Sequence, residues 1–515
     1  MLTEGSRQPD VINTVLGPRA GVLELVFRLL PLQNLKNVRM VCNLWREAGG
    51  PVLWARGVLM VTRENQARVV EAMDQGLQAV RKIRVSRGVS EELLEAIASH
   101  SMVMSVDMPN SDLSDVEPEL LARALAELVV VDMSHSRLDK QLAEAVFTAV
   151  CEAGSQLENL NLSCSNLFSL DKRLLATAVG RLKEINLSST GLTQEQKIEI
   201  LMGVCAENSQ LKTLNIGGIN FSSVDGGLLA RAVASLDSVH MGMTQMTSQQ
   251  AEEILTAVCA QGSVLKTLDI RGNRLSLVEE GLVARAVTSL KQVNLGDTEL
   301  TQRQAEEIFT AISERDSQLE NLDVQGNNLS SVEPNILARA VNSLKEVSFV
   351  NTKLTELQAE ALLKSISTGH SQLKTLDIQY NTLSLVEPAL LVSAVTSVEN
   401  VNLSGTKLTD QQLEAILYIL TFVGTFRLKT LNLSSNTLSL VEAGLLAKGV
   451  NTLEEVVLSD TKLSQQQAEA ILTESLMNTS LKKLDMRFGY GFTWPCVLDK
   501  NLVARIRLKN RNFLL

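Results

Sequence analysis

The chain has 515 residues, of which 45% are hydrophobic, 21% are charged and only 3% are aromatic. One compact core rarely serves so long a chain, so the length predicts several domains or a repeat architecture. The net charge of −10 is uneven, because residues 91–481 carry 27 basic and 49 acidic side chains. This acidic central region argues against a nucleic-acid duplex as its ligand, since phosphates would be repelled.

The first residues lack the pattern of a secretory signal, which is a basic stretch followed by an apolar core. No later apolar run approaches the roughly 20 residues that a membrane-spanning helix needs. The sequence therefore predicts a cytoplasmic or nuclear protein that is not inserted in a membrane. We expect residues 1–15 to form a disordered N-terminal segment.

Residues 16–56 are predicted to form a small all-α module. Apolar side chains recur at helical spacing from Val22 to Leu30 and again from Leu35 to Trp45, and Pro31 separates the two runs. The segment resembles an F-box, a module of roughly forty residues with a characteristic order of apolar pairs, Leu-Pro, Val-Cys and Trp. The matching positions are Val26-Phe27, Leu30-Pro31, Leu35, Val41-Cys42, Trp45 and Trp54.

The F-box resemblance implies docking onto the Skp adaptor of a cullin–RING (SCF) ubiquitin ligase. The residues that it implies for this contact are Val22, Leu23, Phe27, Leu30, Pro31, Leu32 and Leu35. Val38, Val41, Trp45 and Trp54 would instead anchor the module to the first repeat. The alternative is that the whole segment only caps the repeats that follow, since the apolar end of a repeat array must be covered.

From about residue 57 to residue 487 the sequence repeats a pattern of the form LxxLxLxx(N/T)xL followed by apolar residues at helical spacing. Leu157, Leu182, Leu211 and Leu236 begin successive copies, so steps of 25 and 29 residues alternate and the full period is 54 residues. The pattern resembles leucine-rich repeats of the ribonuclease-inhibitor-like class. The resemblance implies an α/β solenoid shaped like a horseshoe, with parallel strands inside and helices outside.

Polar residues occur at fixed positions in each repeat. One type of repeat has Asn after the strand and the other has Thr, and both side chains can bond the backbone at a turn. Helix starts are predicted by capping boxes of the form S/T-x-x-E/Q. The Ser–Glu boxes are Ser276–Glu279, Ser330–Glu333 and Ser384–Glu387, and the Thr–Gln boxes are Thr301–Gln304, Thr355–Gln358 and Thr409–Gln412.

Alternation along the short strands predicts which side chains face the inside of the solenoid. The predicted stripe is small and mildly acidic, and it would suit a basic protein substrate; it could also serve only solubility and hydrogen bonding. Binding surfaces favour Trp, Tyr and Arg, which are rare on this stripe. The candidate substrate-binding residues are His240, Asp269, Arg271, Asp323, Val350, Asp377, Gln379 and Tyr380, with Trp494 from the tail.

Residues 488–515 abandon the repeat and carry Phe488, Tyr490, Phe492, Trp494 and Phe513. Such a tail is expected to cap the last repeat. A tail that folds back towards the inside of the solenoid to help hold a substrate is the alternative.

No motif for bond chemistry stands out. The four histidines lie in distant repeats without cysteines or acids at metal-ligand spacing, and no phosphate-binding glycine loop or HExxH motif occurs. We therefore expect no enzyme activity, no catalytic residue, no cofactor and no metal. The sequence predicts a substrate-recognition subunit of an SCF ubiquitin ligase. The alternative is a leucine-rich-repeat scaffold or inhibitor without a ligase role.

Overall fold

The structure is a computed structural model that describes residues 57–74, 80–86, 88–99, 102–314, 317–369, 371–424, 426–477, 480–487, 502, 505–506 and 513–514. The chain divides into two compact units, unit 1 (Met1–Ile219) and unit 2 (Asn220–Leu515). The predicted F-box module at residues 16–56, the N-terminal segment 1–15 and most of the tail 488–515 lie outside the described residues.

Unit 1 alternates strands and helices. Its strands are β1 (Val58–Thr62), β2 (Lys82–Ser86), β3 (Ser105–Asp107), β4 (Val130–Asp132), β5 (Asn159–Asn161), β6 (Glu184–Asn186) and β7 (Thr213–Asn215). Its helices are α5 (Gln66–Asp74), α6 (Glu91–Ser99), α7 (Pro118–Ala126), α8 (Lys140–Cys151), α9 (Lys172–Arg181) and α10 (Gln194–Val204).

Unit 2 continues the alternation. Its strands are β8 (Ser238–His240), β9 (Thr267–Asp269), β10 (Gln292–Asn294), β11 (Asn321–Asp323), β12 (Glu346–Ser348), β13 (Thr375–Asp377), β14 (Asn400–Asn402), β15 (Thr430–Asn432), β16 (Glu455–Val457), β17 (Lys483–Asp485) and β18 (Phe513–Leu514). Its helices are α11 (Gly226–Ala234), α12 (Ser248–Val258), α13 (Glu280–Ser289), α14 (Gln302–Ile312), α15 (Pro334–Val341), α16 (Glu356–Ser367), α17 (Pro388–Thr396), α18 (Asp410–Phe422), α19 (Ala443–Asn451) and α20 (Gln465–Met477).

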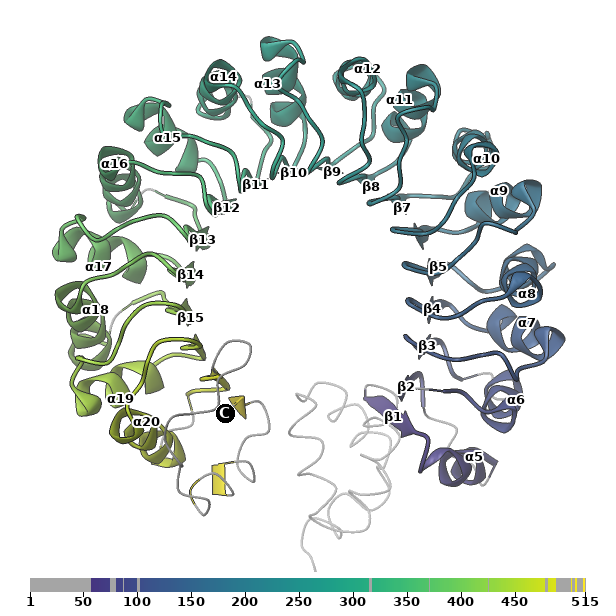
Figure 1. Ribbon diagram of the computed structural model, residues 1–515, viewed down its shortest axis with the longest axis horizontal. Helices are drawn as coiled ribbons and strands as arrows, with labels where there is room; N and C mark the ends of the chain where they lie inside the picture. The colour runs from purple at the N-terminus through teal and green to yellow at the C-terminus, as the bar shows by residue number, and fades with distance from the viewer. Residues whose placement is uncertain are drawn as a thin grey trace, which may run out of the picture. The chain divides into compact units, whose positions relative to one another are not determined.

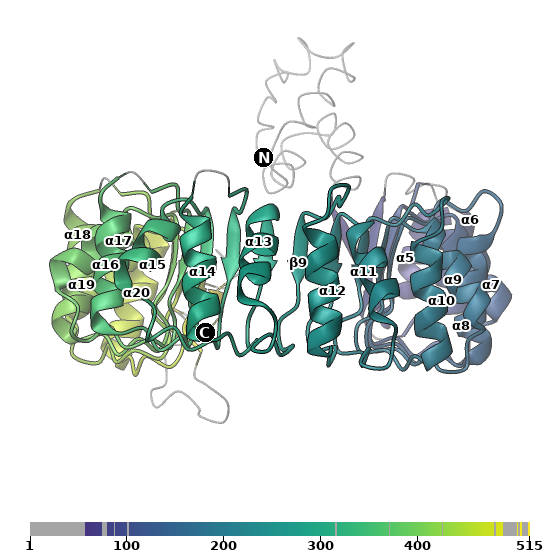
Figure 2. The ribbon, with the colours of Figure 1, turned by 90° about the horizontal axis from the view of Figure 1, so that it is seen from above.

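Within each unit the strands form an inner layer and the helices an outer layer (Figure 1). Successive strands pair in parallel, for example β9 with β10 and β10 with β11. Seen from above, the helices of each unit stand side by side in one layer (Figure 2). The middle residue of a strand, such as Leu268, points into the core between the layers, and so does the residue just after the strand, Ile270; both are buried. The described residues therefore have the architecture of leucine-rich repeats, as the sequence predicts.

A ladder of buried Asn side chains joins neighbouring repeats of unit 2, which confirms the predicted role of this position. The Asn273 Nδ2 donates to the carbonyls of Met241 (2.9 Å) and Ile270 (3.0 Å), and its Oδ1 accepts from the backbone N–H groups of Thr244 (3.1 Å) and Met246 (3.2 Å). The Thr of the other repeat type also bonds the backbone, since Thr244 Oγ1 donates to Met241 O at 2.8 Å. Each Asn thus satisfies backbone groups of its own turn and of the preceding one.

The two kinds of predicted capping box have different outcomes, and the prediction was right only for the Thr–Gln kind. In α14 the Thr301 hydroxyl accepts from Gln304 N, and the Gln304 side chain accepts from Thr301 N, which is a complete capping box. In α13, however, the N-cap residue is Glu279, without a side-chain capping bond, so the predicted box from Ser276 is wrong. The same correction applies to Ser330–Glu333 and Ser384–Glu387, where the glutamate is the N-cap of α15 and α17.

The buried Gln of the capping box explains why the serine is not needed. The Gln304 Nε2 crosses to the preceding repeat and donates to the carbonyls of Leu275 (2.8 Å) and Val278 (2.8 Å). Leu275 and Val278 belong to the turn that contains Ser276, because Val278 N donates to Leu275 O at 2.9 Å. The turn before α13 is therefore held by a side chain from the next repeat. Gln250, Gln358, Gln412 and Gln467 make the same pair of bonds in their own repeats.

Candidate functional site

The third residue of each strand from β8 to β17 belongs to one continuous row on the inner face of the sheet. The flanking second residue of every strand is buried, so the row faces away from the helices. In register, the row runs His240, Asp269, Asn294, Asp323, Ser348, Asp377, Asn402, Asn432, Val457 and Asp485. Four of the predicted candidates, the histidine and three of the aspartates, are members of it.

Most members of the row also have a local structural task. The Asp269 Oδ1 accepts from the backbone N–H of Arg271 at 3.1 Å, which ends the strand in an Asx turn. Asn294 makes the same bond to Gly296 N at 2.9 Å, and Asn402 makes it to Ser404 N at 3.1 Å. Aspartate and asparagine are therefore equivalent for the turn. The negative charge at Asp269, Asp323 and Asp377 is not required by the fold.

The charge is also unfavourable for two of these carboxyls. Burial raises the pKa of Asp323 above its usual value, and the nearby Asp269 carboxylate raises it further, against hydrogen bonds from Gln325 N and Ser348. Burial likewise raises the pKa of Asp377, and Asp323 adds to the rise. The three aspartates stand on every second strand, so neighbours are separated by roughly 10 Å, which is twice the spacing of strands. Their negative charges repel one another.

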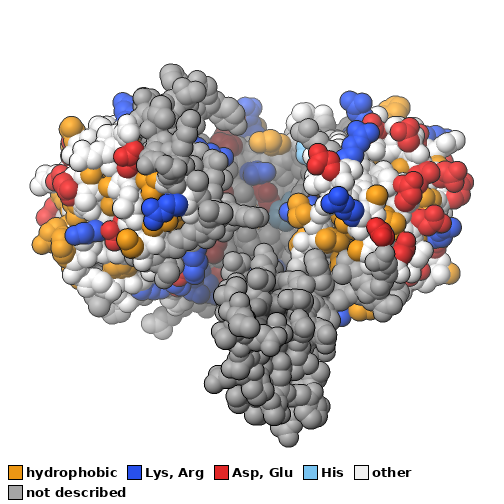
Figure 3. Space-filling model, turned by 90° about the horizontal axis from the view of Figure 1, so that it is seen from below, with side chains coloured by type: hydrophobic (Ala, Val, Ile, Leu, Met, Phe, Trp, Pro, Cys, Tyr) orange, Lys and Arg blue, Asp and Glu red, His pale blue; other side chains and the backbone are white. Residues whose placement is uncertain are grey.

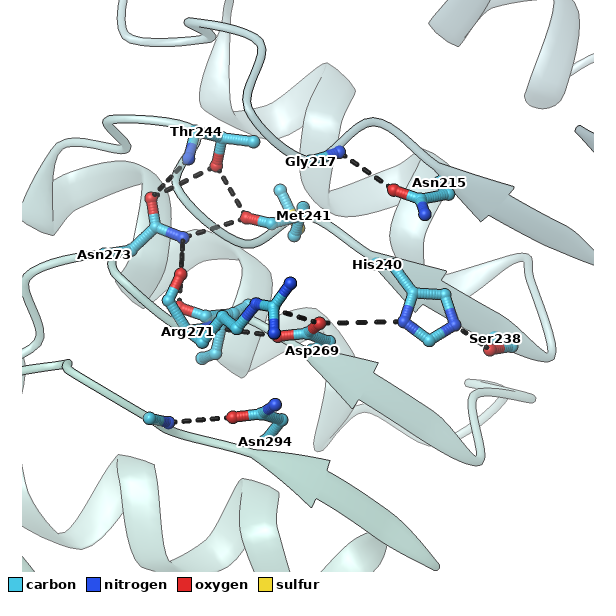
Figure 4. Close-up of polar contacts among 12 residues, drawn as sticks. Asn215, Gly217, Ser238, His240, Met241, Thr244, Asp269, Arg271, Asn273 and Asn294 are labelled. Carbon is cyan, nitrogen blue, oxygen red and sulfur yellow. Dashed lines mark hydrogen bonds and ion pairs between the residues drawn. The ribbon is translucent and has the colours of Figure 1, made fainter. Parts of the chain in front are cut away.

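His240, Asp269 and Arg271 are three predicted residues that form one cluster. Figure 4 shows Asp269 lying between the other two side chains, with its Oδ2 3.7 Å from His240 Nδ1 and 3.8 Å from Arg271 Nε. The far ring nitrogen of His240 lies 3.4 Å from the Ser238 hydroxyl. Both contacts of the histidine are longer than the roughly 2.7–3.2 Å of a typical protein hydrogen bond.

The remaining predicted residues lie at the turns that follow the row. Gln379 is half-buried and its Nε2 lies 3.4 Å from Asp377 Oδ2, while Val350 is half-buried at the turn after β12 and its carbonyl accepts from Gly326 N. Tyr380 is 57% exposed, and its backbone is left-handed with φ of 58°. A Cβ at Gly405 would meet the Tyr380 ring, so the ring lies across the next repeat. Tyr380 thus offers an aromatic surface beside Asp377.

One residue of this face was missed from the sequence. Met243 is 58% exposed, has φ of 57° and lies against Gly272, as Tyr380 lies against Gly405. Alignment of the repeats would have found it, because it follows His240 at the same interval at which Tyr380 follows Asp377. The face therefore has an exposed large side chain, Met243 or Tyr380, at each end of the set Asp269, Asp323 and Asp377.

Trp494 and the whole adaptor-binding set, Val22, Leu23, Phe27, Leu30, Pro31, Leu32 and Leu35, lie outside the described residues. In the part of the chain that the structure describes, no three His, Cys, Asp or Glu side chains are positioned to share a metal ion. In the same part, no helix combines the length and the hydrophobicity needed to cross a membrane.

Comparison with known proteins gives partial likenesses. No family model matches the chain. The chain is 22% identical over 307 residues to Protein CARMIL of Dictyostelium discoideum, an alignment that covers 56% of this chain and 29% of that protein. The chain therefore matches less than a third of that relative's length. A solved leucine-rich-repeat protein of Leptospira interrogans is 16% identical with a TM-score of 0.42, covering 82% of this chain and 99% of that one.

Proposed function

We propose that the chain is a protein-binding scaffold, and that the inner face of unit 2 holds a basic segment of its partner. The observation that carries this proposal is the charge at Asp269, Asp323 and Asp377. Asparagine makes the same turn at Asn294 and Asn402, and two of the three carboxyls have their pKa raised by burial. The fold does not need these negative charges, and burial opposes them. They therefore support a cationic partner that would neutralise them.

The spacing of the row indicates what kind of segment fits. Carboxylates on every second strand lie roughly 10 Å apart, and an extended peptide advances about 3.3 Å per residue. Lys or Arg at every third position of an extended partner would meet successive aspartates. Tyr380, Met243 and Arg271 are exposed beside the row and supply the larger contacts, since Tyr and Arg are enriched among the residues that dominate binding energy.

We further propose that the chain presents this partner to a ubiquitin ligase, acting in the cytoplasm or the nucleus without catalysing a reaction itself. The support is the resemblance of residues 16–56 to an F-box, with Leu30-Pro31 and Val41-Cys42 at the matching positions. In this role Val22, Leu23, Phe27, Leu30, Pro31, Leu32 and Leu35 contact a Skp-type adaptor that is bound to a cullin. The scaffold then raises the effective concentration of the partner's lysines at the ubiquitin-loaded enzyme.

Co-purification with the adaptor tests the ligase role. The full chain is expressed with a Skp adaptor and a cullin, as the natural sequence, as Leu30→Ala/Pro31→Ala and as the control Lys36→Ala. We expect the natural chain and the control to retain the adaptor and the double variant to lose it, with unchanged circular dichroism. A natural chain that fails to bind the adaptor, or a folded double variant that retains it, rejects the ligase role and leaves a scaffold or inhibitor.

A further inference from the structure

The sheet of unit 1 has an open end at β1. The core column that begins at Leu59 continues in register through Ile83, Val106, Val131 and Leu160. These four later members are at most 2% exposed, whereas Leu59 is only half-buried. Within the described residues no repeat precedes β1, so nothing there completes the core on that side.

The side chains of β1 that point away from the helices also depart from the pattern of the other strands. Met60 is 50% exposed and Val58 is 46% exposed. The residues in register with Met60 on the later strands are all polar, namely Arg84, Asp107, Asp132, Asn161, Asn186 and Asn215. Polar side chains at both positions, such as Lys82 and Arg84 on β2, would have suited a strand whose face is exposed to water.

Further exposed apolar side chains lie near the same end. Met104 precedes β3 and is 42% exposed, and Val130 begins β4 and is 37% exposed. Lys82 and Ser105 stand in register between Val58 and Val130, so we call only Val58, Leu59 and Met60 the open-end patch. Figure 3, viewed from the side on which β1 and α5 lie, shows hydrophobic side chains beside Lys and Arg at this end of unit 1. Exposed apolar surface on the first repeat of a solenoid is normally covered by a cap.

The backbone edge of β1 limits how the patch can be covered. The Val61 carbonyl lies on the β2 side, where it accepts from the Ser86 side-chain hydroxyl at 3.3 Å, so the alternate groups Met60 O and Thr62 N face the free edge. Both of these groups are already bonded, since Asn65 Nδ2 donates to Met60 O (3.2 Å) and Asn65 Oδ1 accepts from Thr62 N (2.7 Å). An additional strand would have to break these bonds. Side-chain packing over the patch would not.

We propose that residues 41–56 of this same chain cover the open-end patch through Leu53, Trp54 and Trp45. The described part begins at Gly57, next to β1, so the Cα atom of Trp54 lies within about 14 Å of that of Val58, four residues away. Residues 41–56 hold two of the three Trp residues of the chain. A tethered segment acts at an effective concentration of about millimolar, which favours it over a separate partner.

This contact fixes the segment that resembles an F-box against unit 1 and leaves no freely swinging linker between them. The inference goes beyond the proposed function, because it holds whether or not residues 22–35 bind an adaptor. It names the surface of unit 1, the open-end patch, on which the later half of the N-terminal module would pack.

Fluorescence of one tryptophan tests the proposal on the full chain. In a background of Trp45→Phe and Trp494→Phe, only Trp54 emits, and acrylamide quenching measures its exposure. We expect Trp54 to be shielded in this background. The variant Met60→Glu should raise the uncovered population about five- to thirtyfold, as expected for loss of a contact of ordinary strength. The control Met202→Glu, on exposed surface of α10, should leave the quenching unchanged.

The proposal is overturned if Trp54 is quenched as strongly as in the urea-unfolded chain, or if folded Met60→Glu leaves its shielding intact. Because the charged variant could unfold the first repeat, a photo-reactive analogue placed at Met60 of the otherwise natural chain gives a second test. Its crosslinked peptide should fall within residues 41–56. A crosslink to another region or another molecule contradicts the assignment. Leu30→Ala/Pro31→Ala should keep Trp54 shielded, which separates this inference from failure of the ligase role.

Discussion

Replacement of Gln304 tests the cross-repeat bonding that holds unit 2 together. Its side chain is fully buried and takes part in three hydrogen bonds, to Thr301 N (3.0 Å), Leu275 O (2.8 Å) and Val278 O (2.8 Å). At about 0.5–1.5 kcal/mol net for each bond, Gln304→Ala should lower the free energy of unfolding by about 3 kcal/mol. Gln304→Glu should cost more, about 3–5 kcal/mol, because it points a buried carboxylate at two carbonyl oxygens.

Gln302 supplies the matched control in the same helix. It is exposed, and its Nε2 bonds Glu306 (2.9 Å) and Ser331 O (3.3 Å) at the surface. Gln302→Ala should change the free energy of unfolding by no more than about 0.5 kcal/mol.

Hydrogen exchange gives the local free energy of opening, which suits a solenoid whose repeats contact only their neighbours. Protection should fall first in α13 and α14 and least in α19 and α20. A loss below about 1 kcal/mol for Gln304→Ala, or tolerance of Gln304→Glu, would refute the reasoning, since three buried bonds cannot cost so little.

Two further predictions concern charge and backbone. Asp323→Asn should raise the melting temperature at neutral pH, because Asn can accept from Gln325 N as Asp323 does at 3.0 Å. The raised pKa of Asp323 means that the ionised carboxylate destabilises the fold, so thermal melts should show the advantage shrinking as pH falls through that raised value; an advantage that grows in acid contradicts this. Gly326→Ala should cost about 1–2 kcal/mol in urea unfolding, since φ is 69° and the methyl would overlap Asp297. Gly281→Ala, in α13 with ordinary contacts, should instead stabilise by about 0.5 kcal/mol, and equal effects of the two substitutions would argue against backbone strain at Gly326.

The repeat pattern was enough to predict the strands, the helices and the bonding of Asn to the backbone of its own turn, because these depend on positions within one repeat. Asn273 and the Thr301–Gln304 box behave as predicted for that reason. The start of α13 was mispredicted because the turn at Ser276 is held by Gln304 of the next repeat, and a bond between repeats does not show in the pattern of a single copy.

The inner face was predictable in position but not in its energetics. Alternation placed His240, Asp269, Asp323 and Asp377 in one row, as the register confirms. The turn bond that makes Asp and Asn interchangeable, and the burial that raises the pKa of Asp323, depend on backbone geometry and neighbouring strands. The adaptor-binding residues and Trp494 stay predictions.

The central claim is that one chain binds an adaptor through its N-terminal segment and a protein partner through the inner face of unit 2. Quantitative crosslinking mass spectrometry of the chain captured from cells tests both at once. Asp269→Asn/Asp323→Asn/Asp377→Asn should lose partners crosslinked near Tyr380 and keep the adaptor, whereas Leu30→Ala/Pro31→Ala should lose the adaptor and keep those partners. The account is contradicted if one variant loses both the adaptor and the partners, or if each variant keeps both.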